Sequence, residues 1–341
     1  MAKKIKQNAS SEEIITLSTT EQSANDGSSF VDQKPKKTKK IYTPTTFKHK
    51  MKVLGVLALL GIFTGSGLGV WYFNTALKSN VDYNLDPAEY IGNVDDSFSS
   101  IGLSKETGWA EKAKAKGLTP ADISVVDNIL LCEYNAQQAS SYEIIGTGKV
   151  LSLGIAQTVY SEKKFDGDAY SFVSISAGML TVATCDVMNK AGNSVTIYQG
   201  QNPTDSGATW TSPETITSDA FSELSGVMPN AVSPYIISEK TIDSASEIVY
   251  DSQSELYSFT VTLKPVESVL RYYKQVKRSG GLEANPEFYS IQITFNINEN
   301  WQFVSTEITE SYKAVKFGMP VTCDGTLVTN YSFDGEVTLP V

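Results

Sequence analysis

Histidine is almost absent from this chain of 341 residues, and its scarcity excludes several classes of enzyme. The single histidine, His49, lies between Lys48 and Lys50, in a segment without other catalytic or metal-binding side chains. Catalysis by Ser-His-Asp or Cys-His groups and zinc binding by an HExxH motif are therefore excluded for all residues after position 52. We expect a protein that is not an enzyme. A hydrolase with paired carboxylates is the remaining enzymatic alternative, because acidic residues are plentiful.

Cysteine is also scarce, and the sequence predicts no metal and no cofactor. Cys132, Cys185 and Cys323 allow one disulfide in an oxidising compartment or three buried thiols, and their helix-like and strand-like contexts favour the thiols. Residues 166–168 read Asp-Gly-Asp, but ligands at the further offsets of a calcium loop are missing. These residues predict a hairpin turn instead.

Basic residues are outnumbered and unevenly placed. The chain has 28 Lys and Arg against 38 Asp and Glu, a net charge of −10. Residues 1–52 hold 11 Lys and five acidic residues, so the remaining residues carry a net charge of −16. A domain this acidic does not bind nucleic acid, because binding requires a basic surface that neutralises phosphates.

The one long apolar run covers residues 53–73 and contains no charged side chain. A helix of about 20 apolar residues is long enough to span a bilayer. Lysines crowd the N-terminal flank, so the N-terminus is expected in the cytoplasm and the C-terminal part outside. A cleaved signal peptide would begin earlier and be shorter, and no cysteine follows as a lipid attachment site. The sequence predicts a single-pass cell-membrane protein with an uncleaved signal anchor.

Four segments follow from this interpretation. Residues 1–52 form a disordered basic cytoplasmic tail, residues 53–73 a transmembrane helix, residues 74–117 an extracytoplasmic stalk, and residues 118–341 a folded domain. The tail contains KPKKTKK at residues 34–40, a basic block that contacts anionic lipid headgroups, contacts nucleic acid weakly, or only sets the topology.

Three glycines within the predicted span share one helical face. Gly61, Gly65 and Gly69 recur every four residues, a spacing that lets two helices approach closely. This face predicts a homodimer or a partner helix in the membrane. The alternative is that these residues reflect only the general frequency of glycine in spanning helices.

The folded domain reads as α+β. Thr119 and Pro120 open a predicted helix that continues to about residue 139. Residues 265–281 predict a second helix, and residues 203–238 form a polar excursion with a short helix at 219–224. Alternating apolar and polar residues predict antiparallel strands most clearly at 257–263 and 291–297. Less regular strands are expected at 142–153, 155–164, 169–177, 181–187, 194–199, 247–251, 302–312 and 326–338.

Two stretches carry a resemblance to a known family. These are SSYEIIGTGKV, where a helix leads into strands, and TVYSEKKFDGDAYSFVSIS, a strand, an Asp-Gly turn and a returning strand. With the order of elements, residues 120–341 resemble the LolA and LppX type of half-barrel lipid and lipoprotein carriers. The resemblance implies a long curved antiparallel sheet whose concave face and helices enclose an apolar cavity for acyl chains. This chain differs in keeping a membrane span and in lacking a lipid-attached cysteine.

Five strand aromatics are candidates for lining such a cavity. They are Tyr170, Phe172, Tyr257, Phe259 and Phe295, and the alternative is that they are ordinary core residues. The function expected is a membrane-anchored extracytoplasmic binding module for a lipid or another apolar ligand. The alternative is an envelope scaffold or an interaction subunit of a membrane complex, with no ligand cavity.

Overall fold

The computed structural model describes residues 81–152, 154–178, 181–204, 206–333 and 335–341. The predicted basic tail, the membrane span and its glycine face at Gly61, Gly65 and Gly69 lie outside the described residues. Within the described part of the chain, no helix combines the length and the apolar character that a membrane crossing needs.

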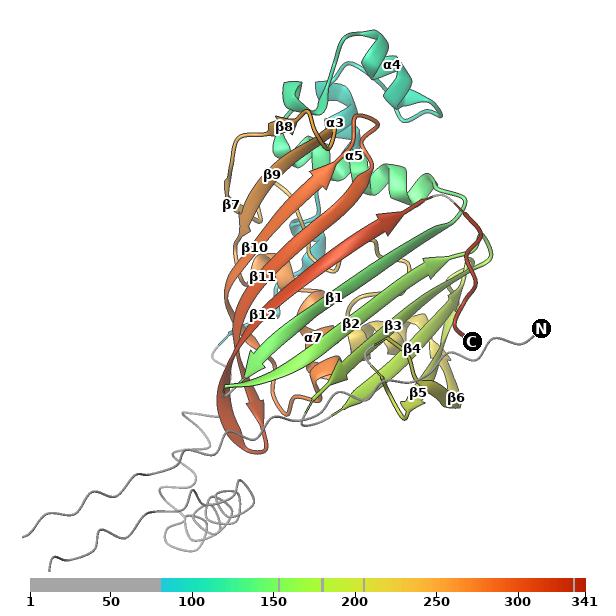
Figure 1. Cartoon of the computed structure of the whole chain (residues 1–341), viewed down its shortest axis with the longest axis vertical. Helices are drawn as coiled ribbons and strands as arrows, with labels where there is room; N and C mark the ends of the chain where they lie inside the picture. Colours follow the sequence, from blue (N-terminus) through green and yellow to red (C-terminus); the bar gives the residue numbers. More distant parts are fainter. Residues whose placement is uncertain (1–80, 153, 179–180, 205, 334) are drawn as a thin grey trace, which may run out of the picture. The chain divides into compact units, whose positions relative to one another are not determined.

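One antiparallel sheet of twelve strands dominates the described residues (Figure 1). The strand order is β6-β5-β4-β3-β2-β1-β12-β11-β10-β9-β7, and β8 also pairs with β9. The first and last strands of this order do not pair with each other, so the sheet is curved but open. The strands are β1 (Tyr142–Ser152), β2 (Ile155–Phe165), β3 (Ala169–Ala177), β4 (Val182–Asn189), β5 (Ser194–Gln201), β6 (Thr209–Thr217), β7 (Ile242–Ala245), β8 (Val249–Asp251), β9 (Leu256–Leu263), β10 (Glu287–Ile297), β11 (Phe303–Lys316) and β12 (Met319–Ser332). The predicted α+β class with a long curved antiparallel sheet is confirmed.

The two strands with the clearest predicted alternation, β9 and β10, are neighbours. Register pairs Phe259 with Phe295 and Val261 with Ile293. All four side chains are buried, and the residues between them on both strands are more exposed. A side-chain period of two therefore determines which face of this half of the sheet covers the core.

Residues 81–117, which were expected in a stalk, are part of the folded domain. They form the short helix η2 (Pro87–Glu89) and the helices α3 (Val94–Ser100) and α4 (Trp109–Ala115). Phe98 and Trp109 are buried, and their rings meet edge to face at 5.2 Å between centroids. Tyr83 stacks on Tyr273 at 4.2 Å. The folded domain thus begins before residue 118.

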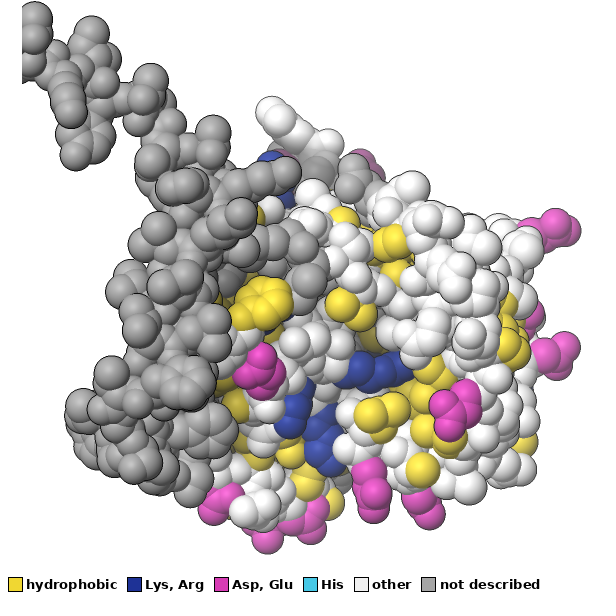
Figure 2. Space-filling view, turned by 90° about the horizontal axis from the view of Figure 1, so that it is seen from below, with side chains coloured by type: hydrophobic (Ala, Val, Ile, Leu, Met, Phe, Trp, Pro, Cys, Tyr) yellow, Lys and Arg dark blue, Asp and Glu magenta, His cyan; other side chains and the backbone are white. Residues whose placement is uncertain are grey.

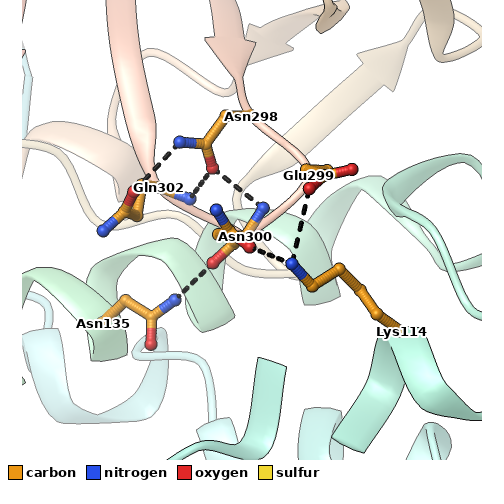
Figure 3. A network of polar contacts seen from close by, with 6 residues as sticks. All are labelled: Lys114, Asn135, Asn298, Glu299, Asn300 and Gln302. Atoms are coloured by element: carbon orange, nitrogen blue, oxygen red, sulfur yellow. Dashed lines mark hydrogen bonds and ion pairs between the residues drawn. The ribbon is translucent and has the colours of Figure 1, made fainter. Parts of the chain in front are cut away.

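Polar contacts also attach α4 to the sheet (Figure 3). Lys114 of α4 donates to the side chain of Asn300 in the turn between β10 and β11. Asn135, on the neighbouring helix α5, donates to the carbonyl oxygens of Asn300 and Trp301 at 2.9 and 2.8 Å. It also accepts from the indole N–H of Trp109 at 2.9 Å. One asparagine therefore links two helices to one sheet turn.

The predicted helix after Thr119 begins later than expected. The Asp122 carboxylate accepts hydrogen bonds from the backbone N–H and the hydroxyl of Thr119 at 2.8 and 2.7 Å, and this closes only the short helix η3 (Pro120–Asp122). Ser124 then accepts from the backbone N–H of Asp127 at 3.0 Å and caps α5 (Val125–Gln138). Two caps occur in succession, and the second one starts the helix.

Two helices follow from the inserted segments. Helix α6 (Ser218–Ser225) matches the predicted residues 219–224, but strand β6 before it was not predicted. Helix α7 (Tyr272–Gly280) is preceded by η4 (Glu267–Val269) and ends at Gly281, which has a φ of 58°. Arg278 of α7 donates two hydrogen bonds to Asp186 of β4, at 2.7 and 2.6 Å. This pair fastens α7 to the concave face of the sheet, while α5 lies across one end (Figure 1).

Candidate ligand-binding site

The middle of the concave face is built from small side chains. Gly146 of β1 pairs with Ser161 of β2 and with Thr329 of β12, and Ser161 pairs with Ser174 of β3. Directly paired residues point to the same face, so these four positions form a continuous floor without a large apolar side chain. A Cβ atom at Gly146 would lie 2.4 Å from the hydroxyl oxygen of Ser161. Glycine in a strand interior permits this close approach.

Helix α7 and the segment of residues 231–237 lie over this floor and leave two adjoining cavities. The first lobe has a volume of about 100 Å³ and the second lobe about 110 Å³. Both lobes are lined by Val159, Ser174, Tyr235, Tyr272, Ser279, Ile308 and Leu327. An apolar cavity of about 150 Å³ accommodates a benzene molecule. Each lobe alone is smaller than that, so a ligand of benzene size or larger requires both lobes or a movement of residues 231–237.

The first lobe extends toward the end of the sheet opposite α5. Lys316, at the end of β11, lines this lobe and donates to the carbonyl oxygen of Gly280 at 2.9 Å. Helix α7, whose Val276, Ser279 and Gly280 line this lobe, also carries Lys274, Lys277 and Arg278. Figure 2 shows this end of the molecule, where basic side chains gather near the middle beside hydrophobic ones and most acidic side chains lie toward the margin. Apolar surface and positive charge thus occur together at this end.

Glu310 is the one carboxylate that lines the first lobe. It accepts hydrogen bonds from the hydroxyl groups of Tyr235 at 2.7 Å and Tyr272 at 3.4 Å. Removal from water raises the pKa of Glu310 to about 7, and the two tyrosine hydrogen bonds oppose this rise. The burial of Tyr235 raises the pKa of its own phenol. Near neutral pH this carboxyl group is therefore balanced between its two protonation states.

A second ionisable group, Lys163, lines the second lobe. Its ammonium group donates to the carbonyl oxygen of Ala231 at 2.6 Å and lies 5.4 Å from the ring centre of Phe172. Burial, together with the nearby positive charge of Arg271, lowers the pKa of Lys163 to about 7, against the opposing effect of Glu133. Gln275 of α7 also lines this lobe, and its side-chain oxygen is buried without a hydrogen-bond partner among the described residues. The second lobe thus offers both a donor and a free acceptor.

A larger and more polar space lies beside the second lobe, and we call it the outer cavity. Its volume is about 610 Å³. It is lined by Gln137, Gln138, Tyr142, Tyr170, Ser222, Gly226, Val227, Met228, Asn230, Ala231, Val232 and Arg271. Arg271 also lines a smaller cavity of about 190 Å³ with Glu133 of α5. Burial raises the pKa of Glu133 to about 7, against the opposing effect of Arg271 and Lys163.

The five predicted aromatic candidates separate into three groups. Phe172 and Phe295 both line the second lobe. Tyr170 lines the outer cavity and stacks on Phe165 at 4.4 Å. Tyr257 and Phe259 line none of the described cavities, and Phe259 instead packs its ring on Phe295 at 5.5 Å. The structure therefore brings two of the five together in one lobe, and their contact with a ligand stays a prediction.

The polar residues of the site were not identified from the sequence. Glu310 occupies an inward position in the series Thr306, Ile308, Glu310 and Tyr312. A carboxylate at a position where the alternation predicts a buried side chain was the one sequence signal for this residue. The sequence did not distinguish Lys163 from its neighbour Lys164. Lys164 points to the opposite face of the strand and forms ion pairs with Glu143 and Glu162. Tyr235 and Tyr272 come from the polar excursion and from α7, and no local pattern relates them to β11.

Metal and thiol chemistry find little support in the described residues. Within them, no three His, Cys, Asp or Glu side chains are grouped so that they could hold a metal ion. Cys132, Cys185 and Cys323 are free and buried. The Asp166 carboxylate accepts from the backbone N–H groups of Asp168 and Ala169 at 3.0 and 2.8 Å, as expected for a hairpin turn.

Comparisons with known proteins are sparse. No protein-family model matches the chain, and no curated protein matches it. Among solved structures, it is similar to the lipoprotein LppX of Mycobacterium tuberculosis, with a TM-score of 0.31 and 10% identity over 63% of this chain and 97% of that one. It is also similar to a DUF1329 family protein of Desulfovibrio piger, with a TM-score of 0.21 and 8% identity over 60% and 88%. LppX is of the type that the sequence resembles. At these TM-scores the functional assignment rests on the cavities alone.

Proposed function

We propose that this protein is a binding module for the apolar part of a lipid or another amphipathic ligand, held in the two lobes over the concave face. The observation that carries this proposal is the empty space above the floor of small side chains. The floor is formed by Gly146, Ser161, Ser174 and Thr329, and Tyr235 and Tyr272 cover the space from the other side. A sheet built only for stability would fill these positions with large apolar side chains, because well-packed interiors leave few voids.

The module is non-enzymatic in this proposal. Glu310 is held by two tyrosine hydroxyl groups, and Lys163 by a backbone carbonyl oxygen. Among the described residues, neither group makes a side-chain hydrogen bond to a serine, threonine or cysteine that it could activate as a nucleophile. Their hydrogen bonds satisfy these two polar groups of the cavity wall, and the remaining surface of the wall is mostly apolar.

The module is proposed to act at the outer side of a membrane. The apolar run of residues 53–73 supports a single membrane anchor with a cytoplasmic N-terminus, and its glycine face supports a dimer or a partner helix. A tethered module receives or presents its ligand at the membrane surface and does not diffuse with it.

The test is to measure bound lipid on the purified full chain. Native mass spectrometry and lipid extraction should detect acyl species on the wild type. Ser174→Phe should lose them, because Ser174 lines both lobes and the added ring occupies that space.

Thr309→Phe is the matched control, since Thr309 is exposed and points to the convex face of β11. This variant should retain the acyl species at the wild-type level. A wild-type protein free of acyl species would overturn the proposal and favour the scaffold alternative. Equal retention by Ser174→Phe would place the ligand elsewhere.

A further inference from the structure

Arginine is rare in this chain, and both examples lie close together in sequence. Of 28 basic residues only Arg271 and Arg278 are arginine. Arg278 forms a two-fold hydrogen-bonded ion pair with Asp186. Arg271 precedes α7 directly, is half-buried, and lines both the outer cavity and the smaller cavity beside it. Its guanidinium group makes no hydrogen bond and no ion pair with any residue that the structure describes.

An unpaired guanidinium group in a partly enclosed site indicates a missing partner. Its five N–H donors form a planar fork that matches a carboxylate or a phosphate. Glu133 is close enough to influence Arg271 electrostatically but forms no ion pair with it among the described residues. Lys163 is also close enough to Glu133 to act on it electrostatically. Arg271 and Lys163 therefore both lie near Glu133, Arg271 at the outer cavity and the smaller cavity and Lys163 at the second lobe.

The outer cavity and the second lobe share a wall. Val232 lines both the outer cavity and the second lobe. Lys163 lines the second lobe, and its ammonium group donates at 2.6 Å to the carbonyl oxygen of Ala231, which lines the outer cavity. At Gly226, an added Cβ atom would lie 2.2 Å from the carbonyl oxygen of Arg271, so the cavity wall is closely packed against the backbone beside the guanidinium group.

We infer that the outer cavity binds the anionic headgroup, a carboxylate or a phosphate, of the ligand whose apolar part enters the second lobe, and that Arg271 is the headgroup receptor. This inference rests on the proposed function, because it assumes a ligand in the lobes. It assigns a direction to that ligand, with the acyl end over the concave floor and the charged end toward α5 and the segment of residues 226–232.

The experiment compares three probes on the full chain kept soluble in amphipol, with affinities measured by isothermal titration calorimetry. Octanoate carries the chain and the charge, 1-octanol carries the chain alone, and acetate carries the charge alone. Wild-type protein should bind octanoate roughly tenfold more tightly than 1-octanol, since hydrogen bonds to charged groups are among the stronger polar contacts. Acetate should bind far more weakly than octanoate. Arg271→Gln should reduce octanoate affinity to the 1-octanol level and leave 1-octanol unchanged.

Two further variants separate the headgroup contact from general charge effects. Glu133→Gln removes the neighbouring negative charge and should tighten octanoate binding, which supports the site even if Arg271→Gln does not fold. Lys149→Gln removes an exposed lysine on the convex side of β1 and should change neither affinity.

The outcomes distinguish this inference from the proposed function. Equal wild-type affinity for octanoate and 1-octanol overturns the headgroup site and leaves the apolar site intact. Acetate binding as tight as octanoate binding also overturns it, because the cavity then serves a free anion. If neither octanoate nor 1-octanol binds, the proposed function fails as well.

Discussion

The protonation of Glu310 should make the stability of this protein depend on pH in a direction opposite to that of ordinary carboxylates. The pKa of Glu310 is raised from 4.5 to about 7 in the folded protein, mainly because its carboxyl group faces a cavity instead of bulk water. Between these values the folded state binds more protons than the unfolded state. The free energy of unfolding therefore falls as pH rises through this window.

The magnitude follows from the two pKa values. Full ionisation of Glu310 costs about 3 kcal/mol, and about 2.5 kcal/mol of this cost appears between pH 5 and pH 8. Glu310→Gln keeps a polar side chain of similar size and removes the titration. The variant should resemble the wild type near pH 5 and exceed it by about 2 to 3 kcal/mol at pH 8.

The assay is urea unfolding of both proteins at pH 5, 6, 7 and 8, in amphipol and under identical salt. Taking the difference between the two proteins removes contributions from Glu133 and Lys163, which are not among the groups that perturb Glu310. Glu307→Gln is the control, because Glu307 is exposed on the same strand. Its difference from the wild type should stay within about 0.5 kcal/mol across the series. A pH-independent difference for Glu310→Gln would show that this carboxyl group is solvated normally and that the Tyr235 and Tyr272 contacts do not enclose it.

Two other predictions concern the attachment of α7 and the apolar run of residues 53–73. Asp186→Asn should lower the free energy of unfolding by about 3 kcal/mol or more, because it leaves Arg278 buried without its charged partner. Glu287→Gln removes a longer and less buried pair with Lys313 and should cost under about 1 kcal/mol, so equal losses in chemical unfolding would contradict a special role for the α7 pair. If residues 53–73 form the proposed membrane helix, Gly65→Leu should abolish self-association in a membrane two-hybrid assay, since a bulky side chain would separate two such helices. An unchanged signal would remove the glycine face as an interface.

Local sequence patterns predicted the structure correctly where a single physical rule determines it. The strict alternation in residues 257–263 and 291–297 gives two half-buried strands whatever the rest of the chain does, because successive side chains point to opposite faces. The turn at Asp166 and the left-handed glycine that ends α7 at Gly281 follow from equally local chemistry.

Local sequence patterns did not predict the structure where two helix-start signals competed, or where a residue packs against a part of the chain that is distant in sequence. Thr119 and Ser124 are both good helix caps, and only the packed structure shows that the first closes a single short turn. Residues 81–117 look weakly patterned, yet Phe98 and Trp109 are buried because α5 and the turn at Asn300 cover them. A polar and glycine-punctuated composition did not distinguish a stalk from a set of short packed helices.

The sequence by itself determined the class of the domain, the order of most of its strands along the chain, and the lack of a histidine-based active site, since these depend on periodicity and composition. The tertiary structure alone decided where the cavity lies and which polar groups face it. Gly146, Ser161 and Ser174 become one floor only through strand register, and Glu310 meets Tyr235 only because a segment 75 residues away folds over β11. Such contacts depend on the path of the whole chain, and no short window of residues contains them.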